Sequence, residues 1–466
     1  MPFDPEYVSR VLRENFEDAK ALFLSPLMAI HYAHLIMLRE RGIISEGDAR
    51  TLRGPLDSIS IAELESAEYD HGCEDLFFHV EREIIGVCGE DVAGRLRVAR
   101  SRNDIDMTMY RMRQREFIAS VTAAVLDLRS ELIDLAAKHR DTLFAALTHT
   151  QPAQPTTVAH YLLAIIEQLE RDHTRMRAAY ASTNRCPLGA CAITGTGFDI
   201  DRKLTSDLLG FDEPTGNTYG SIATVDYLLE SVAATQVMLI GLGRVVQDLL
   251  LWCTREFGYL RLAEGLVQGS SIMPQKRNPV ALEHARAITS KALGQAGAIA
   301  AAVHNTPFGD IVDTEDDLHP LVASMFRDAL RAVALVALSV RGAELDVERM
   351  EARAAEGGTT LTELADRLVR DQNVSFTMAH AIAAGLLSGL VPPTSLGYTD
   401  EEFTRILSAR NFVQVRRTAG GPAPFETARA LDESRESLRR DREWHDAARQ
   451  AVEDATTRRR ERAAAL

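Results

Sequence analysis

The sequence has 466 residues, which is enough for two or three domains. Hydrophobic residues make up 46% and charged residues 26%, as in ordinary soluble globular proteins, so disorder and fibrous structure are disfavoured. The formal net charge of −15 argues against a nucleic-acid binder and against a membrane-surface protein, because both roles favour clustered Lys and Arg.

The cysteines and the first residues favour a reducing, cytoplasmic compartment. The five cysteines are odd in number, irregularly spaced and lack a CxxC pair, so neither a disulfide framework nor a structural zinc site is expected. The first ten residues are polar and acidic with two prolines, unlike a secretory signal peptide. The most apolar runs, such as Val237 to Gly243, are too short to span a bilayer.

Long helices dominate the predicted elements. A stripe at three- and four-residue steps predicts a first long helix that Asn103 or Asp104 caps; its members are Val121, Val125, Leu128, Leu132 and Leu135. Residues 221–257 lack proline and predict a second helix, whose wide apolar face should be buried on more than one side. An Ala-rich third helix is expected from Pro279 to about Val303. Helices of roughly 35 residues and 50 Å favour a bundle shared between subunits.

Segments rich in helix-breaking residues separate these helices. Residues 148–155 form a Pro-punctuated segment that predicts a loop, and residues 186–218 and 269–279 predict two further irregular connections. Gly357-Gly358 predicts a domain boundary, and residues 441–466 predict a charged helix or tail.

The loop at residues 269–279 carries the most specific pattern. It reads Gly-Ser-Ser-Ile-Met-Pro-Gln-Lys-Arg-Asn-Pro, which combines hydroxyls, two cations and an amide suited to an anionic substrate. From composition alone, a polar surface loop is the simpler interpretation. The full string, however, resembles the signature of the fumarase/aspartase superfamily, and its Pro-Gln-Lys most resembles argininosuccinate lyase.

Other segments resemble the same family in the same order. Residues 100–104 (Arg-Ser-Arg-Asn-Asp) resemble its first signature, and residues 148–155 with His160 resemble its second. Weaker matches at residues 33–34, 41–44, 364–369 and 376–380 extend the resemblance over nearly the whole chain. It implies a mainly α fold of three domains, at residues 1–104, 105–356 and 357–466. The central long-helix bundle would form the core of a homotetramer whose active sites are shared between subunits.

The resemblance also implies roles for individual residues. Ser270 would be the general base, and its alkoxide would need nearby cations and backbone amides, with Lys276 as the obvious cation. Thr148 and His149 would act on the leaving-group side, with Glu283 pairing with the imidazole of His149. The substrate contacts would come from Ser101, Arg102, Asn103, Gln151, Met273 and Asn278. Alternatively, Gln151, Gln154 and His160 only order the second segment.

The implied reaction is β-elimination from an N-substituted aspartate, which releases fumarate and an amine and needs no metal or organic cofactor. The partner is then a small dicarboxylate. A second interpretation is argininosuccinate lyase itself. A third, fumarase or carboxymuconate cycloisomerase, is disfavoured by the Pro-Gln-Lys and Arg-Ser-Arg-Asn-Asp segments. A non-catalytic, crystallin-like relative is disfavoured because Ser270, His149 and Lys276 are all present.

The sequence departs from argininosuccinate lyase where that family binds arginine. The corresponding segment of that family reads Tyr-Asn-Arg-Asp-Leu-Gln-Glu-Asp-Lys. In this sequence Gly309 replaces its Tyr, Thr314 replaces its Gln and Asp317 replaces its Lys. Two further family positions differ, with Val225 in place of an Arg and Val280 in place of an Asp. We therefore expect an amine other than arginine, as in lyases for ethylenediamine-disuccinate. An acidic cluster indicates either a cationic, polyamine-like leaving group or a solvated acidic face; it comprises Asp310, Asp313, Glu315, Asp316 and Asp317.

Overall fold

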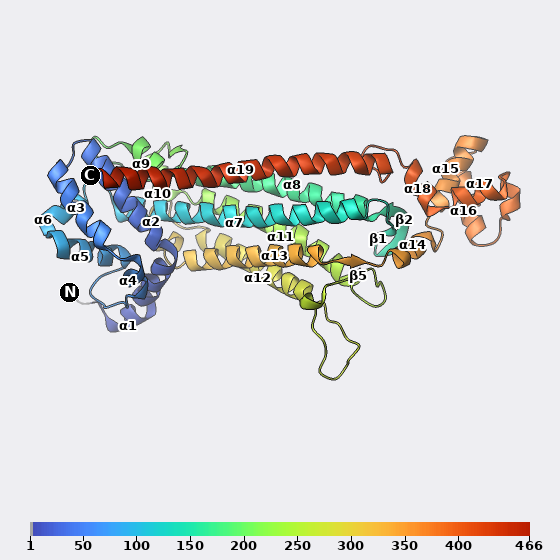
Figure 1. The fold of residues 1–466 in the computed structure, drawn as a ribbon, viewed down its shortest axis with the longest axis horizontal. Coiled ribbons are helices and arrows are strands. Elements are labelled where there is room, and N and C mark those ends of the chain that lie inside the picture. Colours follow the sequence, from blue (N-terminus) through green and yellow to red (C-terminus); the bar gives the residue numbers. More distant parts are fainter. Residues whose placement is uncertain (1–2) are drawn as a thin grey trace.

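The computed structural model describes residues 3–466, so the first two of the ten N-terminal residues considered above lie outside it. The molecule is elongated and mainly helical, and its sheets are three two-stranded pairs within the described residues (Figure 1). This confirms the mainly α fold class predicted from the sequence.

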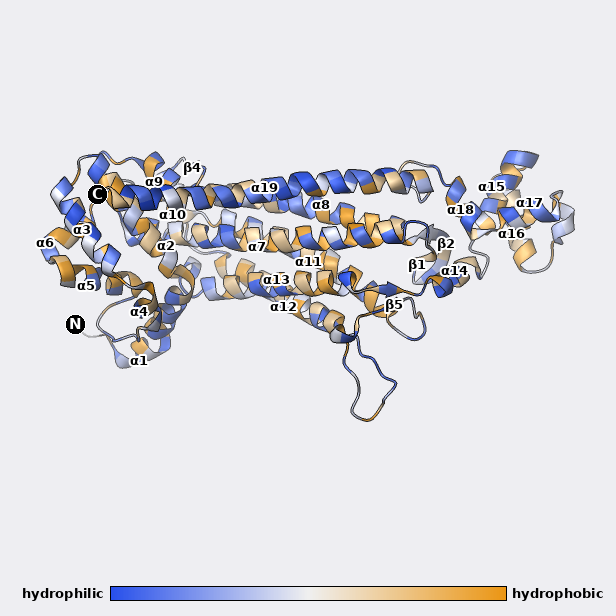
Figure 2. Ribbon diagram, viewed as in Figure 1, coloured by the Kyte–Doolittle hydropathy of each residue, from blue (hydrophilic) through white to orange (hydrophobic). Residues whose placement is uncertain are grey.

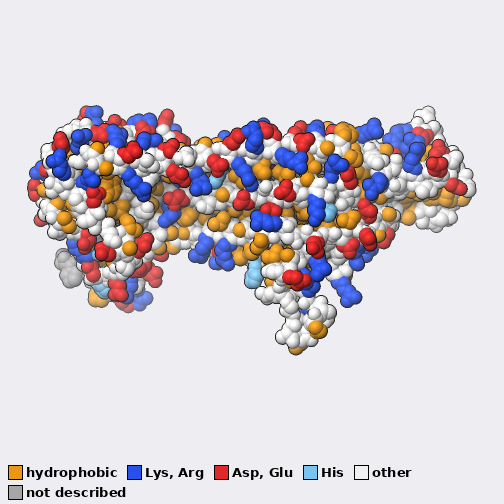
Figure 3. All heavy atoms as spheres, in the orientation of Figure 1, with side chains coloured by type: hydrophobic (Ala, Val, Ile, Leu, Met, Phe, Trp, Pro, Cys, Tyr) orange, Lys and Arg blue, Asp and Glu red, His pale blue; other side chains and the backbone are white. Residues whose placement is uncertain are grey.

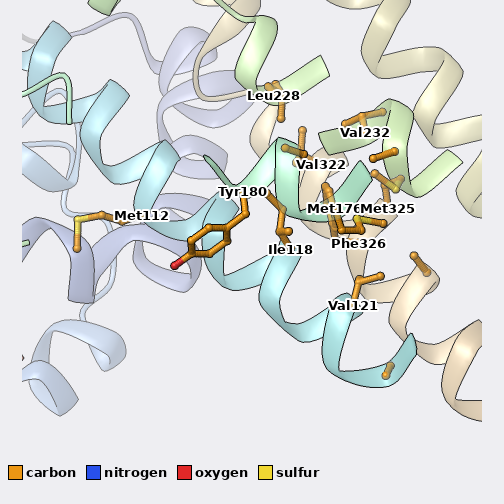
Figure 4. Packing of buried hydrophobic residues seen from close by; sticks show 14 of the residues in the cluster. Met112, Ile118, Val121, Met176, Tyr180, Leu228, Val232, Val322, Met325 and Phe326 are labelled. Carbon is orange, nitrogen blue, oxygen red and sulfur yellow. The ribbon is translucent and has the colours of Figure 1, made fainter. Parts of the chain in front are cut away.

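A bundle of long helices forms the middle of the molecule. Its members are α7 (Arg102–Lys138), α8 (Val158–Thr183), α11 (Asp226–Trp252), α12 (Val280–Val303), α13 (His319–Arg341) and α19 (Pro424–Ala464). They run along the long axis of the molecule (Figure 1). Where α7, α8, α11 and α13 meet, buried side chains from all four helices interdigitate (Figure 4), among them Ile118, Met176, Val232 and Phe326. Close packing of such side chains holds the bundle together.

The beginnings of two helices differ from the sequence prediction. Ser101, not Asn103 or Asp104, is the N-cap of α7, and Asp104 completes a capping box from inside the first turn. The predicted helix over residues 221–257 is divided, because the chain is extended at Thr224 between α10 (Thr218–Ala223) and α11. The Ala-rich helix α12 lies where it was expected.

Shorter elements surround the bundle. At one end lie α1 (Pro5–Tyr7), η1 (Val8–Leu12), α2 (Arg13–Glu40), α3 (Glu46–Ser58), α4 (Ile61–Ser66), α5 (Leu76–Cys88) and α6 (Glu90–Arg95). At the other end lie α14 (Val347–Ala355), α15 (Leu361–Gln372), α16 (Phe376–Leu387), η4 (Pro393–Leu396), α17 (Asp400–Ile406) and α18 (Ala409–Val415). The remaining elements are β3 (Arg185–Cys186), α9 (Arg202–Leu208), β4 (Glu213–Pro214), β5 (Leu260–Arg261), η2 (Glu264–Leu266), η3 (Val312–Thr314) and β6 (Glu344–Leu345).

The segment predicted as a Pro-punctuated loop is a β-hairpin. β1 (Leu143–Thr148) pairs in antiparallel register with β2 (Gln151–Thr157), and Thr148 lies opposite Gln151. Pro152 and Pro155 lie within β2, which is possible because a two-stranded hairpin has only edge strands. The hairpin projects from the end of the bundle opposite α5 and α6 (Figure 1).

The predicted domain limits stay a prediction, and the C-terminal residues pack in two different ways. Residues 361–407 enclose a small hydrophobic cluster of their own, around Leu364, Leu368 and Ile406. In contrast, α19 returns along α7 and α8 to the opposite end of the molecule, with a largely hydrophilic outer face (Figure 2). The charged segment 441–466 is thus the last part of a bundle helix.

One bundle helix is only partly covered within a single chain. By length and composition, the helices Asp226–Trp252 and Pro5–Glu40 could each cross a membrane. This corrects the sequence-based expectation that the apolar stretches are too short to span a bilayer. The core helices of soluble proteins pass the same test, and the apolar window of Pro5–Glu40 is 78% buried. The window in α11 is only 44% buried, and Val237 and Ile240 lie 45% and 50% exposed. The prediction that this helix is buried on more than one side therefore does not hold for one chain.

Candidate active site

The first signature forms the start of α7. The backbone N–H of Ser101 donates to Asp104 Oδ1 at 2.8 Å, and the amide of Asn103 donates to the carbonyl of Ala192 at 3.1 Å. Asp104 Oδ2 accepts the backbone N–H groups of Gly189 (2.8 Å) and Cys191 (2.9 Å). Burial raises the pKa of Asp104 to about 6, although these amides oppose the rise. One buried carboxylate thus joins the helix start to the irregular segment 186–218.

Arg102 lies between two carboxylates. Its guanidinium contacts Asp75, the N-cap of α5, and Asp106, one turn further along α7 at 3.2 Å. Burial lowers the pKa of Arg102, but the charges of Asp106 and Asp75 outweigh this and raise it above its ordinary value. The predicted substrate ligand is therefore held in place by its own chain.

Further acidic groups surround this pair. The loop before α13 brings Asp316 within 3.5 Å of the amide of Asn15, and its charge acts on both Arg102 and Asp106. Burial raises the pKa of Asp106 to about 7, and burial together with the charge of Asp310 raises that of Glu315 to about 8. The sequence left open whether residues 310–317 face the site or solvent. Part of the segment faces inward, because Asp316 acts on Arg102 and Glu315 lies near Asp106.

The second signature occupies the tip of the β1–β2 hairpin. His149 and Thr150 form the two-residue connection, with φ of 50° and 59°. Positive φ at both positions is the type I′ pattern, which normally requires Gly or Asn, so a β-branched Thr is strained there. Thr148, His149 and Gln151 are all exposed. Strained backbone of this kind is characteristic of functional sites.

The third signature is a projecting loop (Figure 3). Gln268 and Asn278 exchange backbone hydrogen bonds of 3.0 and 2.8 Å, which close the loop at its base. The hydroxyl oxygen of Ser270 accepts the backbone N–H groups of Ile272 (3.3 Å) and Met273 (3.1 Å). Two donors directed at this oxygen would stabilise an alkoxide, as the predicted general base requires.

The base of the loop borders a hollow of about 840 Å³ between the end of α11 and the start of α12. Its lining includes Met273, Lys276, Asn278 and Glu283. These four predicted residues therefore lie around one space. Glu283 and His149 form no ion pair within the described chain, so their predicted pairing is not made inside one copy.

The three signatures lie far apart in one chain. The start of α7 is at the end of the bundle that carries α5 and α6, whereas the hairpin lies at the opposite end (Figure 1). The 37 residues of α7 alone span about 55 Å. The Ser270 loop projects from the side of the bundle between these ends (Figure 1).

Several other residues have structural roles. His160 uses both ring nitrogens, at 2.8 Å from Thr156 Oγ1 and 3.0 Å from the carbonyl of Gly420. Gln154 donates to Thr362 at 3.2 Å and so ties the hairpin to α15. The alternative that these two residues order the second segment agrees with these contacts.

Asp106 and Tyr110 were not among the site residues expected from the sequence. Both follow Arg102 at four-residue steps, so the three side chains share one face of α7. The signal that could have identified them is the pair of opposite charges, Arg102 and Asp106, on a helix face that is otherwise buried.

One group of metal-type ligands is present among the described residues: Asp70, Cys73 and His79. The guanidinium of Arg82 donates to Asp70 at 2.6 Å and lies 3.0 Å from His79 Nδ1. A cation already lies among these ligands, so we interpret the group as a structural contact.

Comparison with known proteins agrees with the signatures. A family model described as Lyase matches residues 63–294. Argininosuccinate lyase 2 of Agrobacterium fabrum is 41% identical over 445 residues, which cover 90% of this chain and 88% of that protein. Argininosuccinate lyase 1 of Shouchella clausii is 35% identical over 452 residues, covering 92% and 91%. A solved structure of EDDS lyase in complex with formate superposes with a TM-score of 0.86 at 29% identity, covering 99% of this chain and 96% of that one.

The chain is therefore a lyase of the fumarase/aspartase superfamily. Within that superfamily it belongs with the argininosuccinate lyases and is an enzyme that releases fumarate by breaking a carbon–nitrogen bond.

Proposed function

We propose that the enzyme cleaves an N-substituted aspartate into fumarate and an amine other than arginine. The observation that carries this proposal is the position of Asp316, whose charge acts on both Arg102 and Asp106, with Glu315 near Asp106. The carboxylate of an arginine leaving group would meet Asp316 there and no free cation among the described residues, because Arg102 already contacts Asp75 and Asp106. Like charges that approach closely in a partly buried site oppose binding.

The reaction follows from the predicted roles. Ser270, as its alkoxide, takes a proton from the carbon beside the one that bears nitrogen, and the electron pair moves into the neighbouring carboxylate. Lys276, Asn278 and the start of α7 stabilise the second negative charge on that group. The pair then forms the carbon–carbon double bond as the carbon–nitrogen bond breaks. The nitrogen keeps that bond's electrons and takes a proton from His149, with Thr148 beside it.

We also propose a cytoplasmic homotetramer in which different copies supply the three signatures. The distance between the signatures along the bundle and the half-covered apolar face of α11 both support this arrangement. The unpaired state of all five cysteines agrees with a reducing compartment.

Complementation tests the shared site. Two inactive variants, Ser270→Ala and His149→Gln, are unfolded and refolded together so that their copies mix. Mixed tetramers that hold intact signatures on different copies should recover part of the activity. No recovery in tetramers shown by light scattering and mass spectrometry to be mixed, or full activity in a monomer, would contradict the shared site.

The substrate is tested by running the reaction backward. Fumarate is incubated with arginine, ammonia, diamines and amino acids, and adducts are detected by mass. A succinyl adduct with another amine, at a higher rate than with arginine, is the expected result.

Argininosuccinate lyase itself is the second candidate, and the 41% identity to an argininosuccinate lyase favours it. An adduct with arginine alone would establish it.

A further inference from the structure

A hollow of about 450 Å³ lies between the β1–β2 hairpin, α8, the end of α11 and α18. Both strands of the hairpin line it, and the lining reaches Leu147, the residue before Thr148. Pockets that hold small molecules usually measure about 300–1,000 Å³, so this hollow has room for a small ligand.

Aromatic rings form part of its wall. Phe144, Tyr161 and Trp252 pack against one another, with ring centroids 5.8, 5.6 and 5.1 Å apart. Tyr161 is half-buried, whereas Phe144 and Trp252 are buried. The faces of aromatic rings attract cations, and rings gathered around one space are a common means of recognising alkylammonium groups.

One carboxylate in the hollow has no counterion in its own chain. Asp248, on α11, accepts the hydroxyl hydrogen of Tyr161 on Oδ2 at 2.8 Å. Among the described residues, its other oxygen accepts no hydrogen bond, and no Lys, Arg or His forms an ion pair with it. Burial and the charge of Asp248 raise the pKa of Tyr161 well above its ordinary value, so the hydroxyl keeps its proton and remains a donor.

The two other titratable groups in the lining already have partners. The guanidinium of Arg416 pairs with Glu363 and, at 3.2 Å, with Asp366. It also lies over the ring of Phe412. His160 uses both ring nitrogens. Among the described residues that line the hollow, the charge without a partner is therefore negative, which favours a cationic ligand over an anionic one.

The donor set favours an organic cation over a metal ion. Asp248 is the single acidic residue among the described residues of the lining. Divalent metals require several oxygens around one point, and the aromatic side of the hollow does not supply them. An alkylammonium ion needs one negative charge and an apolar wall, and both are present.

We propose that this hollow binds an alkylammonium ion, with its charge beside Asp248 and its alkyl groups against Tyr161 and Trp252. The site shares no lining residue with the hollow at the base of the Ser270 loop, and the inference does not depend on the proposed lyase reaction. The hairpin carries His149 at its tip (Figure 1). A bound ion would therefore hold this hairpin against α11 and α18.

The test compares two ligands of the same shape. Choline carries a quaternary ammonium group, and neohexyl alcohol has a carbon in place of the charged nitrogen. Calorimetric titration of the full-length enzyme, without fumarate, should show that choline binds on the order of tenfold more tightly than the alcohol. Asp248→Asn keeps an oxygen for the Tyr161 hydroxyl but removes the charge, and should abolish this preference. Glu230→Gln is the matched control, because Glu230 is an exposed acidic residue of the same helix, and it should keep the preference.

A second pair of variants tests the site without changing Asp248. Ala164 is an exposed residue of the lining, on α8, so a longer side chain is tolerated there. Ala164→Lys introduces a tethered ammonium group and should abolish the preference for choline. Ala164→Met adds a neutral chain of similar length and should keep the preference. Thermal unfolding of each variant without ligand shows whether it is folded.

The outcomes decide the inference. Equal binding of choline and neohexyl alcohol, or no binding of choline at millimolar concentrations, would overturn it. So would a preference for choline that survives Asp248→Asn, because the ammonium group would then lie elsewhere. If Asp248→Asn does not fold, the Ala164 pair decides, and a preference retained in Ala164→Lys refutes the site. Since the titration contains no fumarate, failure of the proposed reaction would leave these results unchanged.

Discussion

Two parts of the predicted active site differ in how much of their structure one chain provides. The start of α7 is packed, and its charged groups have partners from α5, from the segment 186–218 and from the loop before α13. The Ser270 loop is open, and Ile272 at its tip is 84% exposed. Each copy therefore builds the start of α7 and its acidic neighbours from its own residues. The open loop leaves the proposed base, Ser270, accessible to residues that another copy would supply.

Removing the base should have the largest effect. Ser270→Ala should lower kcat by about 10²–10⁴-fold, the usual contribution of a proton-transferring group, without lowering the unfolding midpoint. Ser271→Ala, the exposed neighbour in the same loop, should retain activity. Fumarate release followed by ultraviolet absorbance measures both, and equal losses in the two variants would show that Ser270 has no special role.

A change in the packed region at the start of α7 should instead lower the stability of the folded protein. Asp104→Ala leaves the backbone N–H groups of Gly189 and Cys191 without their acceptor, and should lower the free energy of unfolding by roughly 2–3 kcal/mol. Asp104→Asn keeps an acceptor oxygen and should cost less. Urea unfolding measures both changes. A loss of activity with unchanged stability would mean that Asp104 contributes to the reaction and not to the contacts between α7 and the segment 186–218.

The same contrast explains what the sequence could reveal. Apolar periodicity gave the positions of α7 and α12, and the specific strings of the three signatures led to the family. The helix ends were less certain. Asn103 and Asp104 both suit a cap by residue type, and only the backbone, which is extended at Ser101 and helical from Arg102, shows that the helix begins earlier.

Other features depend on contacts across long separations in the sequence. Pro152 and Pro155 indicate a loop locally, yet pairing with residues 143–148 makes a hairpin. The role of Asp316 depends on Asn15 and Arg102, which are distant along the chain. Periodicity along the chain does not predict contacts between distant residues. The acidic segment could therefore be recognised from the sequence, but its position in the fold could not be predicted.

The acidic cluster predicts a pH dependence of stability. Burial raises the pKa of Asp106 to about 7, above its unfolded value of roughly 4. The folded protein therefore holds a proton that the unfolded chain has released, and this stabilisation is lost as pH rises from about 4 through 7. Glu315, with a pKa of about 8, changes in the same direction. The charged and titratable groups that face Asp106 are Asp75, Arg102, Tyr110, Glu315 and Asp316.

Comparison of variants isolates this effect. Between about pH 5 and pH 8 the Tm of the ligand-free enzyme should fall more than that of Asp106→Asn, by the equivalent of roughly 2–3 kcal/mol. Asp313→Asn should behave like the unmodified enzyme. Thermal unfolding in matched buffers provides the values, and parallel curves for all three proteins would show that Asp106 is ionised throughout this range.

The hairpin tip should show the smallest change, and in the opposite direction. Thr150 holds φ at 59°, where a β-branched side chain is strained and glycine is not. Thr150→Gly should raise the free energy of unfolding by about 1 kcal/mol, because relief of strain outweighs the added freedom of the unfolded chain. Since this residue adjoins His149, the same change should lower kcat if the strained turn aims the imidazole at the leaving group. A more stable variant with unchanged kcat would separate the strain from the chemistry and leave the turn as a structural feature of the hairpin alone.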